Sequence, residues 1–327
     1  MKIKNAKILA AALSFGLIFA GCSNDKGADT STETKTEDAA KTDDAAKTDD
    51  AAKAPEEKKE ETDTASAEDY DFTVVSREDG SGTRGAFVEL VGLMEKVDGE
   101  EEDMTTLDAI VQNSTNGVMQ TVAKDTNAIG YISLGSLNDS VKALNIDGVE
   151  ATEENIANGS YKLQRPFNLA YKESELDDLA KDFLAYVASS DAQKIVADLG
   201  YVPLKDSKAY EKKDVKGNLT VAGSTSVTPL MEKMAEEYEK LNPDVKIEIQ
   251  STGSSAGIEA VIDGAANIAM ASRELKDEEK EQLTPSVIAT DGIAVVVNKE
   301  SKVSDISLDD LKEIFAGNIL NTSELEK

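Results

Sequence analysis

The chain has 327 residues and a formal net charge of −29, with one cysteine and neither histidine nor tryptophan. This balance argues against nucleic acid as a partner, because nucleic-acid phosphates are bound by clustered lysine and arginine. A disulfide within the chain, a Cys/His metal site and histidine-based acid–base or triad catalysis are all excluded by the composition.

The first 22 residues have the layout of an export signal. Lysines precede a short apolar run at residues 8–20, and this run is shorter than the roughly 20 residues of a membrane-spanning helix. The run leads into Gly21-Cys22, which resembles a bacterial lipoprotein signal, in which the cysteine is lipidated and becomes the mature N-terminus. We therefore expect residues 1–22 to be a lipoprotein signal and Cys22 to anchor the protein to the outer face of the cell membrane. A plain signal peptide with an unrelated cysteine is the alternative.

Residues 23–69 are expected to form a disordered acidic tether. Leucine, isoleucine, valine and phenylalanine are absent from residues 24–69, and a six-residue unit rich in Thr, Asp, Ala and Lys repeats between residues 36 and 53. Such a segment cannot bury enough apolar surface to offset the entropy lost on ordering. A spacer of this kind suits a protein that must stand clear of a membrane.

From residue 70 onward, apolar strands alternate with amphipathic helices. Strands are predicted at residues 72–76, 128–134, 141–146, 165–171, 218–222, 245–250, 268–271 and 293–297. Helices are predicted at residues 85–96, 117–123, 176–189, 191–199, 227–241, 258–263, 273–283 and 308–315. A polar loop is expected at residues 100–105 and a charged connector at residues 205–217. This alternation is typical of an α/β protein with largely parallel sheets, in which ligands bind at the carboxyl ends of strands.

Three strand-to-helix junctions combine glycine with serine or threonine. They are Gly80-Ser81-Gly82-Thr83, Gly223-Ser224-Thr225-Ser226 and Gly253-Ser254-Ser255-Ala256-Gly257. A helix N-terminus favours an anion through its unpaired N–H groups and its dipole, and the hydroxyls add further donors. One such loop alone is more typical of an ordinary helix cap. Three of them, with Arg77 beside the first, indicate a site for a tetrahedral oxyanion.

These loops, with residues 77–87, 219–226, 272–276 and 291–298, resemble the phosphate-binding proteins that serve bacterial phosphate ABC transporters. The resemblance extends over nearly all of residues 70–327. It implies an α/β, two-lobed, type II periplasmic-binding-protein-like fold, with mixed, largely parallel sheets and a ligand cleft between the lobes. It also implies a monomer that captures inorganic phosphate and delivers it to a membrane permease, without catalysis, cofactor or metal.

The same resemblance suggests which residues would bind phosphate: Arg77, Ser81, Gly82 and Thr83 on one side of the cleft, and Thr225, Ser226 and Ser254 on the other. Asp79 would pair with Arg77 and hold its guanidinium in place. In the family an aspartate commonly accepts the proton of hydrogen phosphate and thereby discriminates against sulfate. This chain has Arg273 at the aligned position, so Asp291 is the substitute candidate, with an ordinary turn residue as the alternative.

The family's segments occur here in a different order. The loop equivalent to that of Thr225 opens the family's mature chain, and the loop of Arg77 comes in its second half. A circular permutation would make one lobe from residues 70–162 plus 299–327, and the other from residues 163–298 with the connector inside it. A fragment of a tandem protein and an exchange of halves between two chains are the alternatives.

Two other functions remain open from the sequence. The first is binding of another tetrahedral oxyanion, such as sulfate or molybdate, which the same donors would accept. The second is a surface protein without a transport role, either a phosphate sensor or an adhesion protein. An enzyme is the least favoured class, because the chain has no histidine for acid–base or triad catalysis.

Overall fold

The structure, a computed structural model, describes residues 69–97 and 100–325. The signal, Cys22 and the tether up to residue 68 lie outside the described residues. The described residues all belong to one compact unit. None of the helices in its described part is long and apolar enough to cross a membrane.

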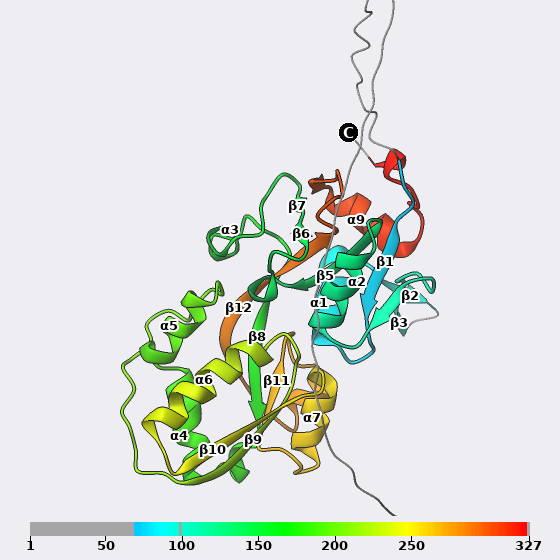
Figure 1. The fold of residues 1–327 in the computed structure, drawn as a ribbon. Coiled ribbons are helices and arrows are strands. Elements are labelled where there is room, and N and C mark those ends of the chain that lie inside the picture. Colours follow the sequence, from blue (N-terminus) through cyan, green and yellow to red (C-terminus); the bar gives the residue numbers. More distant parts are fainter. Residues whose placement is uncertain (1–68, 98–99, 326–327) are drawn as a thin grey trace, which may run out of the picture. The chain divides into compact units, whose positions relative to one another are not determined.

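A nine-stranded mixed sheet runs through the described residues (Figure 1). Its main path is β10 (Val245–Ser251), β9 (Gly217–Gly223), β11 (Ile268–Ala271), β8 (Gln164–Tyr171), β12 (Thr284–Val297), β5 (Ala128–Ser133), β1 (Thr73–Arg77) and β4 (Ile110–Gln112), and β6 (Lys142–Ala143) pairs with β12. The strands at each end of the path are parallel to their neighbours, whereas β8 and β12 are antiparallel to theirs. The predicted α/β class with mixed sheets is confirmed.

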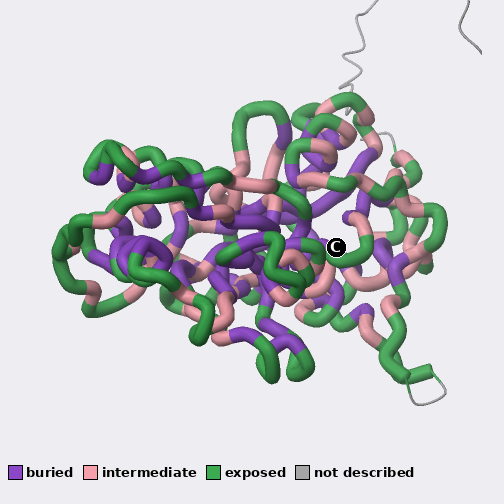
Figure 2. The backbone as a smooth tube through the Cα atoms, turned by 90° about the horizontal axis from the view of Figure 1, so that it is seen from below, coloured by how far each residue is buried: buried purple, intermediate pink, exposed green. Residues whose placement is uncertain are grey.

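The helices connect these strands, and shorter elements decorate them. The helices are α1 (Gly82–Val91), α2 (Thr115–Lys124), α3 (Glu153–Ala157), α4 (Asp178–Val187), α5 (Ser190–Asp198), α6 (Thr228–Leu241), α7 (Ser254–Ile262), α8 (Asp277–Lys280) and α9 (Leu308–Ala316). Two small pairs stand apart from the main sheet: β2 (Met94–Val97) with β3 (Glu100–Asp103), and β7 (Asn145–Ile146) with β13 (Asp305–Ile306). In Figure 2 the buried segments of the chain lie inside, and exposed segments surround them.

Strand β12 is the element that joins the two halves of the sheet. Residues 284–292 pair with β8, and residues 293–297 pair with β5. The N–H of Ile293 also donates to the carbonyl of Leu163, directly before β8, at 2.7 Å. The chain therefore crosses between the two halves near Leu163–Arg165 and near Asp291–Ile293.

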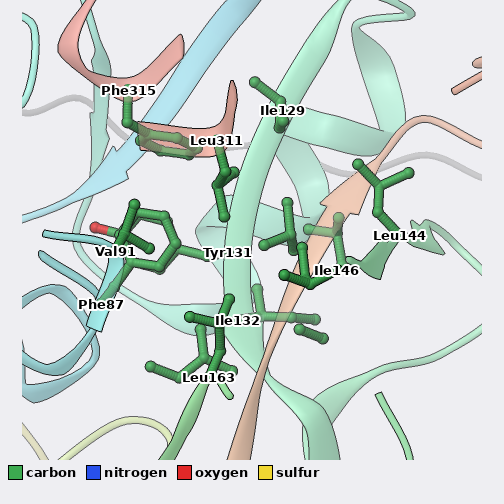
Figure 3. Packing of buried hydrophobic residues seen from close by; sticks show 14 of the residues in the cluster. Phe87, Val91, Ile129, Tyr131, Ile132, Leu144, Ile146, Leu163, Leu311 and Phe315 are labelled. Atoms are coloured by element: carbon green, nitrogen blue, oxygen red, sulfur yellow. The ribbon is translucent and has the colours of Figure 1, made fainter. Parts of the chain in front are cut away.

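Separate hydrophobic clusters lie on either side of this crossing. The first contains buried residues from 74–163 and 293–315, and Figure 3 shows part of its packing. The ring of Phe87 stacks on that of Tyr131 with centroids 3.9 Å apart, and Phe315 packs edge-on against Phe87 at 4.8 Å. The other clusters contain residues from 167–289. The sequence predicted that residues 293–297 belong to the lobe of residues 163–298. In the structure they pack in the first cluster.

The C-terminal segment packs beside the first strand. The N–H of Phe72 donates to the carbonyl of Leu320 at 2.8 Å, and the N–H of Thr322 donates to the carbonyl of Tyr70 at 3.0 Å. Helix α9 contributes Phe315, which packs edge-on against Phe87. The two ends of the described unit therefore complete one hydrophobic cluster together (Figure 1).

The connector at residues 205–217 is held by a buried carboxylate. The hydroxyl of Tyr210 donates to Asp182 on α4 at 2.5 Å, and the hydroxyl of Tyr238 on α6 donates to the same oxygen at 2.6 Å. Burial and the Asp182 carboxylate together raise the pKa of Tyr238, which keeps it a proton donor. The rings of Tyr210 and Tyr186 pack edge to face. The connector is thus part of the second hydrophobic cluster.

Several predicted boundaries were wrong, each for a local reason. The first helix ends at Val91 because Gly92 adopts a left-handed conformation at its C-terminus, and residues 94–103 form the β2–β3 hairpin in place of helix end and loop. The helix predicted at 273–283 is reduced to α8, because Arg273 and the N–H of Lys276 both bond to the side chain of Glu279. Helix α7 starts at Ser254, and β12 starts at Thr284.

Candidate functional site

The glycine-rich loop after β1 forms the N-terminus of α1. Ser81 is the N-cap, and its hydroxyl accepts a hydrogen bond from the N–H of Arg84 at 3.3 Å. Gly82 and Thr83 form the first turn, where backbone N–H groups have no partner within the helix. All three residues are buried, so these donors face protein or a bound group and not bulk solvent.

Helix α7 begins directly against this loop. A Cβ on Gly82 would lie 2.4 Å from the hydroxyl oxygen of Ser254 and 2.7 Å from that of Ser272. The N–H of Ser255 donates to the carbonyl of Gly80 at 3.1 Å. The N-termini of α1 and α7 therefore meet, although their residues are more than 170 positions apart. Glycine at position 82 makes this approach possible.

The loop before α6 and the start of α2 complete the group of hydroxyls. Thr83 Oγ1 lies 2.9 Å from Ser226 Oγ. Thr115 Oγ1 lies 3.3 Å from Thr225 Oγ1 and 3.2 Å from Ser226 Oγ. Thr115 opens α2 directly after the cap Ser114, so this helix N-terminus also belongs to the site. Sequence reasoning missed Thr115, although Asn113-Ser114-Thr115 follows an apolar stretch in the manner of the other loops.

Arg77 is the cation of this site, and it is almost fully buried. Its Nε and Nη2 each donate to the carboxylate of Glu78 at 2.8 Å. Nη2 also donates to Thr225 Oγ1 at 3.1 Å, and Nε donates to the carbonyl of Gln112 at 3.2 Å. Within the described residues, Nη1 is buried without a hydrogen-bond partner, as is the hydroxyl of Ser272. These two atoms are donors that a bound anion could use.

The comparisons with known proteins agree with this chemistry. The PBP superfamily domain matches residues 61–191 and 208–324. "Phosphate-binding protein PstS 2" of Streptococcus agalactiae is 51% identical over 267 residues, which are 81% of this chain and 91% of that protein. A crystal structure of a phosphate-binding protein of a phosphate ABC transporter from Streptococcus pneumoniae is 46% identical with a TM-score of 0.64, and the match covers 79% of this chain and all of that one.

The chain belongs to the PstS family of phosphate-binding proteins. PstS of Bacillus subtilis, by contrast, is 39% identical over 142 residues, which are 43% of this chain and 44% of that protein. The streptococcal relatives thus match over most of their length, and the Bacillus relative matches over less than half.

Asp79 does not have the role in this PstS-family site that the sequence predicted. Its side chain is 99% exposed and pairs with Arg84 at 3.2 Å, and Glu78 pairs with Arg77 in its place. The reason is the turn at this point, which the N–H of Ser81 closes onto the carbonyl of Glu78. Asp79 and Gly80 are the central residues of that turn, so Asp79 points to solvent.

Asp291, the predicted substitute for the family's aspartate, is fully buried in an ion pair. It accepts hydrogen bonds from Nε and Nη2 of Arg165 at 3.2 and 2.9 Å, and from the hydroxyl of Ser133 at 3.0 Å. Burial raises the pKa of Asp291 and lowers that of Arg165, and the ion pair opposes both effects. Asp291 thus lies in the crossing between β8 and β12 with its carboxylate engaged by Arg165 and Ser133, and a contact with phosphate stays a prediction.

Arg273 lies beside the PstS-type loops but is engaged by other groups. Its guanidinium donates to both carboxylate oxygens of Glu279 at 2.7 Å and to the hydroxyl of Ser255 at 3.2 Å. Burial alone raises the pKa of Glu279, but hydrogen bonds from Arg273 and Lys276 outweigh it and lower the pKa. Arg273 therefore supports the start of α7 through Ser255, and its charge is neutralised locally.

Gly82→Ala is expected to weaken anion binding, because the new methyl group would lie 2.4 Å from Ser254 Oγ and 3.1 Å from Ser254 Cβ. Overpacking of this kind costs about 1–3 kcal/mol, which corresponds to roughly 5- to 150-fold in affinity if it acts on the closed site alone. Phosphate titration calorimetry measures the effect. Gly85→Ala in the same helix is the matched control, since its Cβ would meet Arg273 Cδ at an ordinary 3.5 Å. Equal affinities for the two variants would contradict the close approach of α1 and α7.

Proposed function

We propose that the chain binds inorganic phosphate where α1, α2, α6 and α7 begin, and delivers it to the permease of an ABC transporter without catalysing a reaction. The observation that carries the proposal is the meeting of hydroxyls and helix N-termini from both halves around Arg77. Helix N-termini and hydroxyl donors suit a tetrahedral oxyanion, and a buried arginine adds a geometrically matched charge. The streptococcal relatives, which are named phosphate-binding proteins, support phosphate as the ligand.

The proposed ligands are Arg77, Ser81, Gly82 and Thr83 on one side and Thr225, Ser226 and Ser254 on the other, joined by Thr115. In the structure several of their hydroxyls bond one another across the two halves. A bound anion would replace those bonds with its own. It would also give Nη1 of Arg77 an acceptor, which that atom lacks among the described residues.

The two halves act as lobes in this proposal. We assign residues 70–163 and 293–327 to one lobe and residues 164–292 to the other. The division of the hydrophobic clusters supports these boundaries. This differs from the boundary at residue 298 that the sequence favoured. The two crossings at β8 and β12 would serve as the hinge that lets phosphate enter and leave.

The order of the segments is proposed to be a circular permutation. A chain with exchanged halves should align with an unpermuted relative over one half at a time, which agrees with the match to Bacillus subtilis PstS over 142 residues. The match over 91% of the streptococcal relative supports an order shared with that protein, and argues against a fragment or an exchange of halves between chains. Export and lipidation of Cys22 remain proposals that rest on the signal sequence alone.

Isothermal titration of the purified protein with inorganic phosphate tests the function. We expect one site with a dissociation constant of about 1 μM or tighter, which corresponds to about −8 kcal/mol. Sulfate added at millimolar concentration should not displace phosphate if the site is selective. Displacement by sulfate would favour a general oxyanion carrier. The absence of both heat and thermal stabilisation at millimolar phosphate would overturn the proposal and leave a sensor or adhesion role for another ligand.

A further inference from the structure

Exposed apolar side chains are concentrated in one stretch of the described residues. Eight large apolar side chains are exposed in the whole described part of the chain. Five of them fall between residues 97 and 111: Val97, Met104, Leu107, Ile110 and Val111. Leu107 is fully exposed, and Val111 is 57% exposed. Single exposed apolar residues are ordinary on a protein surface, but a cluster indicates a contact with a partner.

This stretch includes an open sheet edge. Strand β4 is the last strand of the main sheet and pairs with β1 among the described residues. Its Ile110 and Val111 are both exposed. An edge strand with apolar side chains and free backbone groups is usually covered, because it otherwise promotes association. We call the surface formed by the β2–β3 hairpin, Leu107 and β4 the edge surface.

The edge surface is strongly acidic. Residues 94–108 contain seven aspartates and glutamates and one lysine. Glu100, Glu101 and Glu102 are exposed on β3, and Figure 2 draws this hairpin as exposed. The charge excludes two occupants. A second copy of the chain would bring acidic hairpins together in a twofold contact, and an anionic membrane surface would repel them.

The edge surface is connected by hydrogen bonds to the residues of the proposed phosphate site. The carbonyl of Gln112, the last residue of β4, accepts hydrogen bonds from Nε of Arg77 at 3.2 Å and from the N–H of Glu78 at 3.1 Å. Thr115, three residues further on, contacts Thr225 and Ser226. A partner that moves β4 therefore moves the carbonyl that holds Arg77.

A pocket beside the hairpin reaches both halves of the chain. Its volume is about 320 Å³, and its lining includes Met94 and Asp103 of the hairpin together with Arg84, Ser255 and Arg273. Arg84 and Ser255 belong to different halves, on α1 and α7. A partner seated on the edge surface and entering this pocket would contact both halves, and would distinguish their closed arrangement from an open one.

We infer that the edge surface is where the transporter's permease docks, through extracytoplasmic loops that carry apolar side chains flanked by lysine or arginine. The inference rests on the proposed function and names its partner surface. Charge complementarity selects a basic protein, and the contact of Gln112 with Arg77 gives docking a direct route to phosphate release.

Two variants test the inference: Leu107→Ser with Val111→Ser, and Glu100→Lys with Glu101→Lys and Glu102→Lys. The matched control is Leu241→Ser at the end of α6, whose side chain is also exposed. Phosphate affinity by calorimetry should stay within about twofold of the parent for all three, because none of these side chains touches the site. Phosphate uptake into proteoliposomes holding the permease and ATPase subunits should fall at least tenfold for the two edge variants only.

A direct measurement of binding to the permease distinguishes the possible outcomes. The parent should bind the permease in zwitterionic nanodiscs, and both edge variants should lose that binding. Unchanged uptake and binding for both variants would overturn the docking surface. Parent binding to nanodiscs that lack the permease, lost in the variants, would show a lipid contact and also overturn it, as would a dimer in sedimentation that the edge variants dissolve. If the parent binds the permease through this surface but shows no heat with phosphate, the proposed ligand fails and the docking surface stands.

Discussion

Arg77→Met is expected to lower phosphate affinity by roughly 30- to 4,000-fold. Removing one partner of a buried, hydrogen-bonded charge pair costs about 2–5 kcal/mol, and every 1.4 kcal/mol is tenfold in affinity. Arg77 is a buried arginine among the proposed phosphate-binding residues, with one nitrogen bonded to Thr225 and another without a partner in the described residues. Methionine keeps much of the length and volume and removes only the charge and the donors. Phosphate titration calorimetry measures the loss.

Glu78 complicates this variant, because Arg77→Met leaves its carboxylate without the two hydrogen bonds of 2.8 Å. The unpaired carboxylate would itself repel the anion. Combining Arg77→Met with Glu78→Gln removes that charge, and the double-variant cycle isolates the contribution of Arg77. Arg84→Met is the matched control for net charge, since Arg84 bonds to Asp103 at 2.7 Å and donates to the backbone carbonyl of Arg77.

Two results would contradict a ligand role for Arg77. One is a loss of affinity that disappears in the Glu78→Gln background, which would mean that Arg77 serves only to neutralise Glu78. The other is an equal loss in Arg84→Met, which would indicate a general field effect of the positive charge. A loss confined to Arg77→Met in both backgrounds supports direct contact with the anion.

Asp291→Ala is expected to destabilise the protein by about 3–5 kcal/mol, because it leaves Arg165 buried without its counter-charge. At roughly 2–4 °C per kcal/mol for a domain of this size, the melting temperature should fall by about 6–20 °C. Both side chains are almost fully buried, and Ser133 loses its acceptor as well. Thermal unfolding followed by circular dichroism measures the change.

The paired variant Arg165→Met with Asp291→Leu serves as the control. Replacing both members of a buried ion pair by apolar side chains is often neutral or stabilising, so much of the lost stability should return. Asp291→Asn is the milder variant if alanine prevents folding, since its amide oxygen can still accept from Ser133. Phosphate should stabilise all of the folded variants by a similar amount. Unchanged stability together with lost phosphate binding would restore Asp291 as a ligand and contradict its assignment to the crossing strands.

The local chemistry of the three glycine-rich loops could be predicted from the sequence. A strand end, a glycine, a hydroxyl and a helix start are consecutive in the chain, so Gly80–Thr83 and the loops at Thr225 and Ser254 were recognisable as candidates for anion binding. The alternation of strands and helices predicted the α/β class for the same reason. The predicted lipoprotein signal with Cys22 rests on an equally local pattern, and it lies outside the described residues.

The sequence pattern did not decide between Glu78 and Asp79, although the turn that decides it is local. Both are carboxylates close to Arg77 in the sequence, and only the turn closed by Ser81 decides that Asp79 faces solvent. The helix expected at 273–283 failed similarly, because periodicity does not reveal that Glu279 bonds to Arg273 and to the N–H of Lys276. Asp291 looked like a free carboxylate until Arg165, 126 positions away, was found beside it.

The sequence by itself determined the glycine-rich strand-to-helix junctions and the overall alternation, because these depend on residues within a few positions of one another. The tertiary structure alone decided which donors meet: Thr83 with Ser226, Thr115 with Thr225, and Gly82 with Ser254. Those contacts join residues more than 100 positions apart, and their geometry is set by how the hydrophobic clusters on either side of β12 pack. The anion site proposed at four helix N-termini is therefore visible in the sequence only as separate loops, since no local pattern encodes the distance between them.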